Sequence, residues 1–161
     1  MMARAEWFKS AAVRITPVIE RTLGSSPTLR LLAWAQSRVG RPFKWGQTNC
    51  LMLCLEAVDV LRGSDLAGAW RSKCNNIRDV IRNTRRLDAA AELRKAGFIK
   101  INTPPKSGDL IIGLPPHYRQ FSGHVVLGDH CLSSTPQVGV GYAWVRDALR
   151  GPNVSVWRMV N

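Results

Sequence analysis

The chain has 161 residues, of which 45% are apolar and 21% are charged. This length and composition predict one globular domain with its own core and exclude an intrinsically disordered protein. Lys and Arg number 23 against 11 Asp and Glu, a net charge of +12, which excludes an acidic tail protein and favours an anionic partner such as nucleic acid, a cell-wall polymer or a membrane surface.

Residues 1–24 are predicted to form a basic amphipathic helix that serves as an attachment arm. Trp7, Phe8 and Ile15 fall on one helical face, and Pro17 is expected to kink or end the helix. Such a helix suits a membrane surface or a groove on a partner, and it also suits packing on its own domain or on a neighbouring subunit.

No segment approaches the roughly 18 consecutive apolar residues of a membrane span. Near the N-terminus, charged residues interrupt any apolar core of a secretory signal; they are Glu6, Lys9, Arg14 and Glu20. We therefore expect no transmembrane segment and no export signal. If the protein acts outside a cytoplasm, we expect something else to deliver it.

Two longer helices are predicted next. The first begins after Ser26, whose hydroxyl is expected to cap it, and runs to a glycine-proline stop near residue 40. The second begins at Cys50, with Thr48 or Asn49 as its cap, and ends near Gly63. Because its first turns are apolar almost all round, we expect it to be the central buried helix.

Short helices are predicted over residues 64–97, the last of them capped by Asp88 and closed by Gly97. Between residues 71 and 86, six residues are basic and one is acidic. This pattern is typical of a solvated helix face, and it also suits a surface that binds phosphate or another polyanion.

Beyond Gly97, short apolar runs separated by Gly and Pro indicate β-strands. The runs cover residues 98–101, 110–112, 124–127, 139–145 and 154–157. Helices followed by strands predict an α+β domain, in which a helical N-terminal half packs on a C-terminal antiparallel sheet.

The four cysteines predict neither a disulfide framework nor a metal centre. They are few and irregularly spaced, in a chain without an export signal. The C-x3-C spacing of Cys50 and Cys54, with two distant partners, is a poor zinc pattern. We expect no metal and no cofactor, and the simplest interpretation of these side chains is small, buried and apolar.

Cys50 and His124 form the pattern that is chemically most informative. Cys50 falls at a predicted helix N-terminus, where free N–H groups and partial positive charge lower the pKa of a thiol. His124 follows Gly123 at the start of a predicted strand, where an imidazole can act as general base for that thiol. The same two features occur in many proteins that catalyse nothing, so a retained fold without turnover stays an alternative.

Three short motifs surround these two residues: GRPFKWG at residues 40–46, KSGDLII at 106–112 and GHVVLGD at 123–129. In order and rough separation they resemble the NlpC-type cell-wall peptidases, a compact branch of the papain-like cysteine peptidases. The likeness covers about residues 27–160 and is greatest to small members encoded among the tail genes of phages and gene-transfer agents. It implies an NlpC-like peptidase domain over residues 25–161, with a papain-like NlpC-type fold.

The resemblance also implies a catalytic set. Cys50 would attack an amide, His124 would act as base, and the backbone N–H of Cys50 would hold the oxyanion. A third polar residue, which orients the imidazole, would lie on the next strand. Ser133 is nearest in register for that role, with Ser134 and Gln137 as alternates.

Three departures from the family pattern bear on activity. The usual Asp-Cys-Ser-Gly is Asn49-Cys50-Leu51-Met52 here. Losing the acidic charge need not harm a thiolate, but the bulk of Leu51 and Met52 can crowd the cleft. Phe43 stands where many relatives carry a Tyr near the oxyanion, and a phenyl ring cannot donate a hydrogen bond.

Other residues have simpler interpretations. His117 is expected in a solvent-facing loop and His130 in a turn. Cys54, one helical turn after the candidate nucleophile, is expected to point into the core. Asp109 is expected to cap or brace the sheet rather than to act in catalysis, and Trp45 suits either a cleft wall or a packed core.

Three functions follow from these observations. The first is a phage tail-associated cysteine peptidase that hydrolyses peptide-stem amides of peptidoglycan. It would be made in the host cytoplasm and delivered in the virion, with the N-terminal helix bound to other tail proteins. The second is a catalytically inactive structural virion protein with the same fold. The third is a basic accessory protein with non-specific nucleic-acid contact, which only the charge supports.

Overall fold

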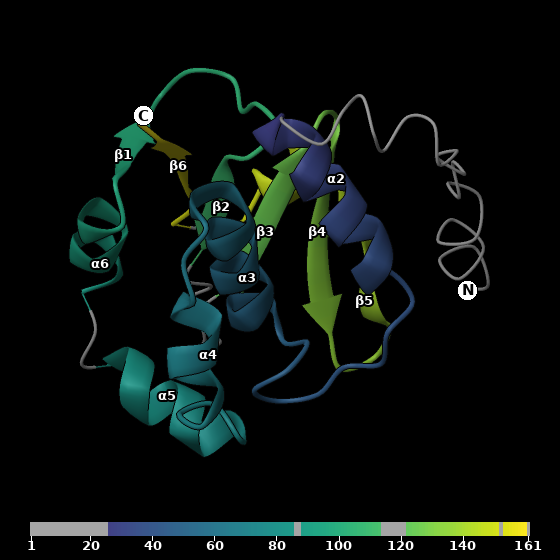
Figure 1. The fold of residues 1–161 in the computed structure, drawn as a ribbon, viewed down its shortest axis with the longest axis vertical. Coiled ribbons are helices and arrows are strands. Elements are labelled where there is room, and N and C mark those ends of the chain that lie inside the picture. Colours follow the sequence, from purple (N-terminus) through teal and green to yellow (C-terminus); the bar gives the residue numbers. More distant parts are fainter. Residues whose placement is uncertain (1–25, 86–87, 114–121, 152, 161) are drawn as a thin grey trace.

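The computed structural model describes residues 26–85, 88–113, 122–151 and 153–160 (Figure 1). The predicted attachment arm, residues 1–24, lies outside them. The helices are α2 (Pro27–Arg38), α3 (Cys50–Arg62), α4 (Leu66–Arg71), α5 (Ile77–Arg85), α6 (Ala89–Lys95) and α7 (Val145–Ala148). The strands are β1 (Phe98–Ile101), β2 (Leu110–Gly113), β3 (Ser122–Leu127), β4 (His130–Thr135), β5 (Gly139–Trp144) and β6 (Ser155–Met159).

The strands form one antiparallel sheet in the order β1-β6-β2-β3-β4-β5. Strand β6, the last along the chain, lies between β1 and β2 and pairs Trp157 with Leu110. The prediction of an α+β domain with helices packed on an antiparallel sheet is confirmed. Within the described ranges, no helix combines the length and apolar character that a bilayer crossing requires.

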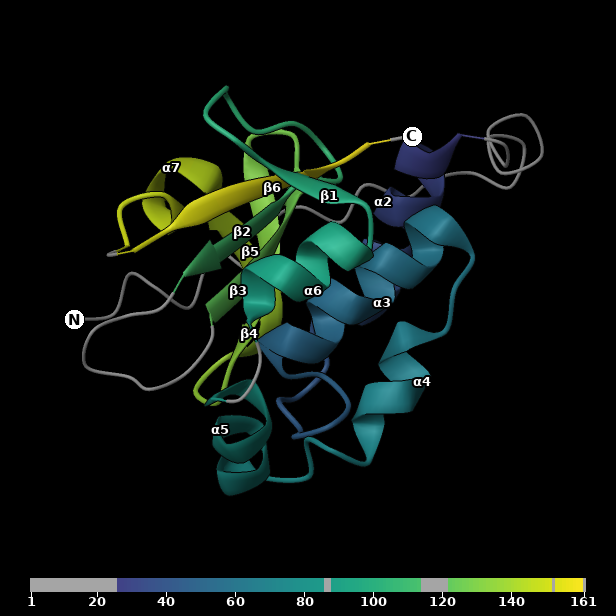
Figure 2. The same cartoon turned by 90° about the vertical axis from the view of Figure 1, so that its left-hand side faces the viewer.

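Helix α3 is the central helix of the domain. It packs across β3 and β4, and α2 and α4 pack on it. Figure 2 shows these three helices on one side of the sheet and α7 on the other. Leu53 and Ala57 of α3 share one buried cluster with Val125 of β3 and Leu132 of β4. Because side chains alternate along a strand, the neighbouring His124 belongs to the opposite face of β3.

Local signals placed most helix ends correctly. The side chain of Asp88 accepts the Ala91 N–H and caps α6, and Gly63 closes α3 in the left-handed region at φ +70°. Ser26 and Asn49 occupy the N-cap positions of α2 and α3, but neither side chain makes a capping hydrogen bond. The capping roles predicted for these two side chains are therefore wrong.

Strand β4 begins at His130, in a stretch where no apolar run predicted a strand. The turn between β3 and β4 contains only Gly128, at φ +68°, and Asp129. His130, predicted to be a turn residue, is the first residue of β4, and its ring stacks on Trp144 of β5 at 4.1 Å between centroids. The aromatic contact with the next strand accounts for its place in the sheet.

A buried carboxylate joins three helices. Glu56 of α3 is only 5% exposed and lies 2.8 Å from Arg38 Nε of α2 and 2.7 Å from Arg71 Nη2 of α4. Its other contact is with Trp34, whose indole N–H donates to it at 3.1 Å. Because a buried charge is tolerated only when paired and hydrogen-bonded, these contacts fix α2 and α4 against α3.

Candidate active site at Cys50 and His124

The segment of residues 39–49 brings Cys50 to the start of α3, and its first part is anchored on β5. The Gly40 N–H donates to the Val140 carbonyl at 2.9 Å, and the Val140 N–H donates to the Arg41 carbonyl at 2.9 Å. These paired bonds extend the edge of the sheet by a short stretch of main chain and limit how far the loop can move.

The second part of the loop is closed by two polar side chains just before α3. The Thr48 hydroxyl donates to the Pro42 carbonyl at 2.6 Å and accepts the Lys44 N–H at 2.7 Å. The Asn49 side-chain oxygen accepts the Gly46 N–H at 3.0 Å. Thr48 and Asn49 therefore hold the loop rather than cap the helix, which explains the missing capping bond.

Gly46 has a close neighbour as well as an unusual backbone conformation. Its φ is +69°, and a Cβ atom at this position would lie 2.8 Å from the Arg71 carbonyl oxygen and 3.3 Å from that of Cys74. The loop before Cys50 thus packs directly against the main chain that follows α4, which only glycine permits.

Cys50 is half-buried at the first turn of α3, and its thiol interacts with the backbone N–H of Gly123 on β3. Burial raises the pKa of this thiol above its ordinary value of 9.0, and the N–H groups of Gly123, Leu51 and Cys50 itself lower the pKa only in part. The prediction of a lowered pKa is therefore wrong, because desolvation outweighs the helix N-terminus. The thiol rests protonated.

His124 is half-buried on β3, directly after Gly123. Burial lowers the pKa of its imidazole below the ordinary value of 6.5. The ring is therefore neutral at neutral pH and keeps one nitrogen as a proton acceptor. Both groups are thus neutral at rest, which differs from a preformed thiolate–imidazolium pair. Strand alternation places the ring on the face of β3 away from the α3 core.

On β4, the side chain of Cys131 contacts the imidazole. Its Sγ lies 3.8 Å from His124 Nδ1 and 3.6 Å from the Ala143 carbonyl oxygen of β5. Cys131 is fully buried, and burial raises the pKa of its thiol to about 12, the Ala143 main chain opposing this in part. Its sulfur therefore stays protonated.

The three residues predicted to orient the imidazole lie in different surroundings. The Ser133 hydroxyl donates to the Gly123 carbonyl at 2.9 Å. Ser134 is buried, and its hydroxyl has no hydrogen-bond partner among the described residues. Gln137 is exposed in the turn after β4. A role for Ser133 in the catalytic set stays a prediction, as does a direct contact between the Cys50 thiol and the His124 ring.

The contact between Cys131 and His124 was not predicted, because the simplest interpretation of this cysteine was a small, buried, apolar residue. A signal was present: Cys131 is two residues before Ser133 on one strand, so both side chains belong to the same face. The observed register, Val126 opposite Cys131 and Val125 opposite Leu132, places that face with His124.

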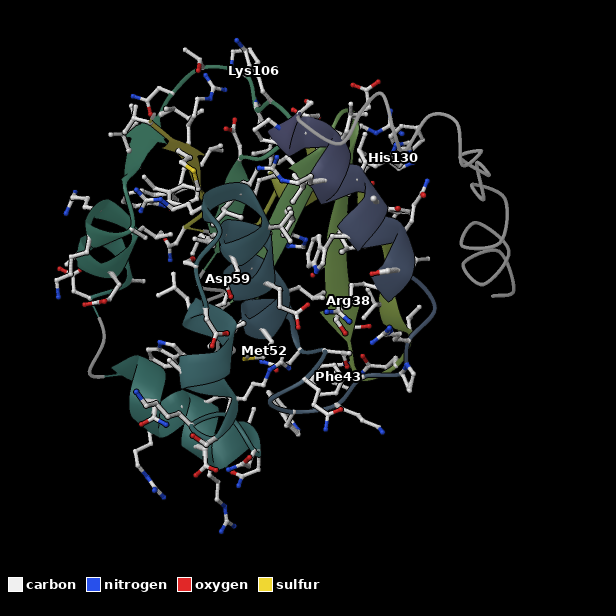
Figure 3. The ribbon with its side chains drawn as sticks, in the orientation of Figure 1. Arg38, Phe43, Met52, Asp59, Lys106 and His130 are labelled. Carbon is white, nitrogen blue, oxygen red and sulfur yellow. The ribbon has the colours of Figure 1, made fainter. Side chains whose placement is uncertain are left out.

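The bulky residues after Cys50 fill a second core. Met52 is fully buried with Ala67 of α4 and Val80 of α5, and Leu51 packs against the same cluster. Figure 3 shows Met52 on α3 and Phe43 on the loop before it. The side chain of Met52 therefore packs in this cluster, and its burial there does not support the expected crowding of the cleft.

Two aromatic residues lie in the loop before Cys50. Trp45 packs against the second core, as one of its two predicted roles requires. The ring of Phe43 meets Trp45 edge-on at 4.8 Å between centroids. Phe43 offers no donor to an oxyanion.

The remaining candidates behave as simple structural residues. Cys54 is buried in the main core, as predicted. Asp109 is buried and accepts two hydrogen bonds from Arg158 of β6, at 3.0 and 2.7 Å, and one from the Lys106 N–H at 2.8 Å. Its predicted role in bracing the sheet is confirmed. His117 lies outside the described residues.

Over residues 26–85, 88–113, 122–151 and 153–160, no group of three or more His, Cys, Asp or Glu side chains is placed to hold a metal ion. The four cysteines, all within these ranges, form no disulfide.

Comparison with known proteins places the chain in a family. The family model for the domain of unknown function DUF6950 matches residues 27–151, from the first residue of α2 to just beyond α7. No curated protein and no solved structure matches the chain significantly. The matched region contains Cys50, His124, Cys131 and Ser133. The chain therefore belongs to the DUF6950 family.

Proposed function

We propose that this chain is an NlpC-type cysteine hydrolase with a papain-like fold that cleaves peptide-stem amides of peptidoglycan. The observation that carries the proposal is the meeting of α3 with β3, where the Cys50 thiol interacts with the backbone N–H of Gly123, next to His124. The order of helix, thiol, strand and imidazole supports it, together with the three motifs that resemble this peptidase group.

In the proposed reaction, His124 takes the proton of the Cys50 thiol while Sγ forms a bond to the amide carbon. The carbonyl electron pair moves to oxygen, which the Cys50 N–H stabilises. The imidazolium then returns the proton to the leaving amine as the C–N bond breaks. Water, activated by the neutral imidazole, hydrolyses the thioester and restores the thiol.

The general-base form of this mechanism follows from the two pKa directions. Since the pKa of the Cys50 thiol is raised and that of His124 is lowered, both groups are neutral at rest. The thiol becomes nucleophilic only as its proton leaves, so a correctly placed imidazole nitrogen matters more than in a preformed ion pair.

The setting we propose is a virion, in which a phage tail or similar injection apparatus delivers the enzyme to the cell wall. Lys73, Arg78 and Arg82 are exposed beside and along α5 and suit contact with an anionic wall polymer. Residues 1–24 would bind other tail proteins.

The test is digestion of purified peptidoglycan by the wild-type chain and by Cys50→Ala and His124→Gln. We expect new muropeptides with free stem-peptide ends from the wild type only. His130→Gln, which changes the exposed histidine of β4, is the matched control and should retain the wild-type profile. Identical profiles from wild type and Cys50→Ala would reject the hydrolase.

A catalytically inactive structural virion protein is the second candidate. Two observations favour it: the raised pKa of the Cys50 thiol and the phenyl ring of Phe43 where a donor to the oxyanion is expected. In that case, Cys50→Ala would leave both the muropeptide profile and incorporation into particles unchanged, whereas deletion of residues 1–24 would abolish incorporation.

A further inference from the structure

We propose that Cys131 is a positioning residue for His124, because its thiol selects the imidazole tautomer in which Nδ1 carries the proton and Nε2 is the base. The catalytic meaning of this proposal rests on the proposed hydrolase. Its structural content does not, since a tautomer can be measured without a substrate.

The argument begins with the two groups on either side of the Cys131 sulfur. His124 Nδ1 lies at 3.8 Å and the Ala143 carbonyl oxygen at 3.6 Å. A thiol has one proton to donate and a lone pair to accept with. The carbonyl can only accept, so the thiol proton serves Ala143 and the lone pair faces Nδ1.

A ring nitrogen that faces a lone pair carries the proton. Nδ1 of His124 therefore donates to Cys131, and in a neutral ring Nε2 is left with its own lone pair. In the proposed hydrolase, Nε2 is then the ring nitrogen left to act as the base. In the opposite tautomer, Nδ1 is an acceptor. The thiol would then have to donate its hydrogen bond to Nδ1, which leaves the Ala143 carbonyl without this donor.

The surroundings keep the sulfur in this role. Cys131 lies on β4 between β3 and β5, paired with Val126 on one side and Ala143 on the other, and it is fully buried. Its high pKa keeps the thiol proton in place at every pH at which the protein would act. Ser133 does not replace it, because its hydroxyl is bonded to the Gly123 carbonyl at 2.9 Å.

A thiol acceptor differs from the carboxylate that orients histidine in other hydrolases. Being neutral, it fixes the tautomer and the ring angle but adds no charge to stabilise the imidazolium. This fits a histidine whose pKa is lowered by burial with no opposing anion.

The experiment is two-dimensional ¹H–¹⁵N NMR of the full chain labelled with ¹⁵N-histidine at about pH 8, where an imidazole is neutral. His117→Gln and His130→Gln assign the three histidines. We expect the His124 signals to show a protonated Nδ1 and an unprotonated Nε2. A wild-type ring protonated on Nε2 would overturn the proposal without reference to any variant.

Two variants test the role of the sulfur. In Cys131→Ser, the hydroxyl can still accept from Nδ1 and donate to Ala143, so the tautomer should be retained. In Cys131→Ala, the ratio of the two tautomers should move by about tenfold or more towards the Nε2-protonated form, with Cys131→Val as the alternative if the smaller side chain unfolds the protein. A tautomer unchanged in Cys131→Ala would reject the proposal, whereas unchanged muropeptides in the Cys50→Ala assay would reject only the hydrolase.

Discussion

The hydroxyl of Ser133 donates a 2.9 Å hydrogen bond to the main-chain carbonyl of Gly123. This bond holds the peptide group that joins Gly123 to His124, while the imidazole ring itself is contacted by Cys131. Ser133 and Cys131, two positions apart on β4, thus act on the histidine in different ways. Ser133 holds its main chain, and Cys131 contacts its ring.

We expect Ser133→Ala to lower the free energy of unfolding by about 1 kcal/mol, the usual loss for one intramolecular hydrogen bond, and to leave the His124 tautomer unchanged. Urea denaturation measures the first effect and ¹⁵N NMR the second. Ser134→Ala is the matched control: its hydroxyl has no hydrogen-bond partner among the described residues, so its removal should be neutral or slightly stabilising. A change of tautomer in Ser133→Ala would assign the ring-orienting role to the serine.

The reactivity of Cys50 towards iodoacetamide should depend on pH as that of a protonated thiol. Since burial raises the pKa above 9.0, the thiolate fraction, and with it the alkylation rate, should still be rising as the pH passes that value. Mass spectrometry of the modified peptide separates Cys50 from the other cysteines. A rate plateau between mildly acidic and neutral pH would instead indicate a thiolate–imidazolium pair, and it should then disappear in His124→Gln.

The stability of the fold should fall in acid through His124. The folded pKa lies below the ordinary value of 6.5, so below that pH the unfolded chain binds protons that the folded chain does not. The free energy of unfolding therefore decreases as the pH falls from 6.5 towards the folded pKa. Thermal unfolding of His124→Gln should show a smaller decrease over this range than the wild type, and an equal decrease would contradict this role of His124.

Gly46→Ala should be more destabilising than Gly63→Ala, although the two φ angles are +69° and +70°. Both substitutions carry the strain of a left-handed residue, about 1–2 kcal/mol. Only at Gly46 does the new methyl group meet a backbone oxygen, at 2.8 Å, whereas nothing lies within 4 Å at Gly63. Comparison of urea midpoints measures the difference, and equal losses would show that the loop yields without cost. Because this loop leads into Cys50, Gly46→Ala should also reduce hydrolysis more than Gly63→Ala does.

Local features of the sequence were sufficient to predict most of the helices and strands, but not β4. Asp88 and Gly63 mark helix ends because a side-chain acceptor and a left-handed glycine act within one turn of main chain. The apolar character of the segment after Cys50 likewise predicted the central helix, since burial on all sides leaves a continuous apolar pattern. These properties need no knowledge of distant residues, so the α+β architecture and the place of Cys50 at a helix start follow from the sequence alone.

The tertiary structure alone decided the properties of the candidate site. The pKa of the Cys50 thiol is raised because the surrounding protein desolvates it, an effect that sums over many residues far apart along the chain. The neighbour of His124 Nδ1 is Cys131 because the β3–β4 register and the packing of the strands set which side chain reaches the ring. Met52 enters a second core because α4 and α5 fold beside it. Desolvation, register and packing are relations between segments, and no local pattern in the sequence encodes them.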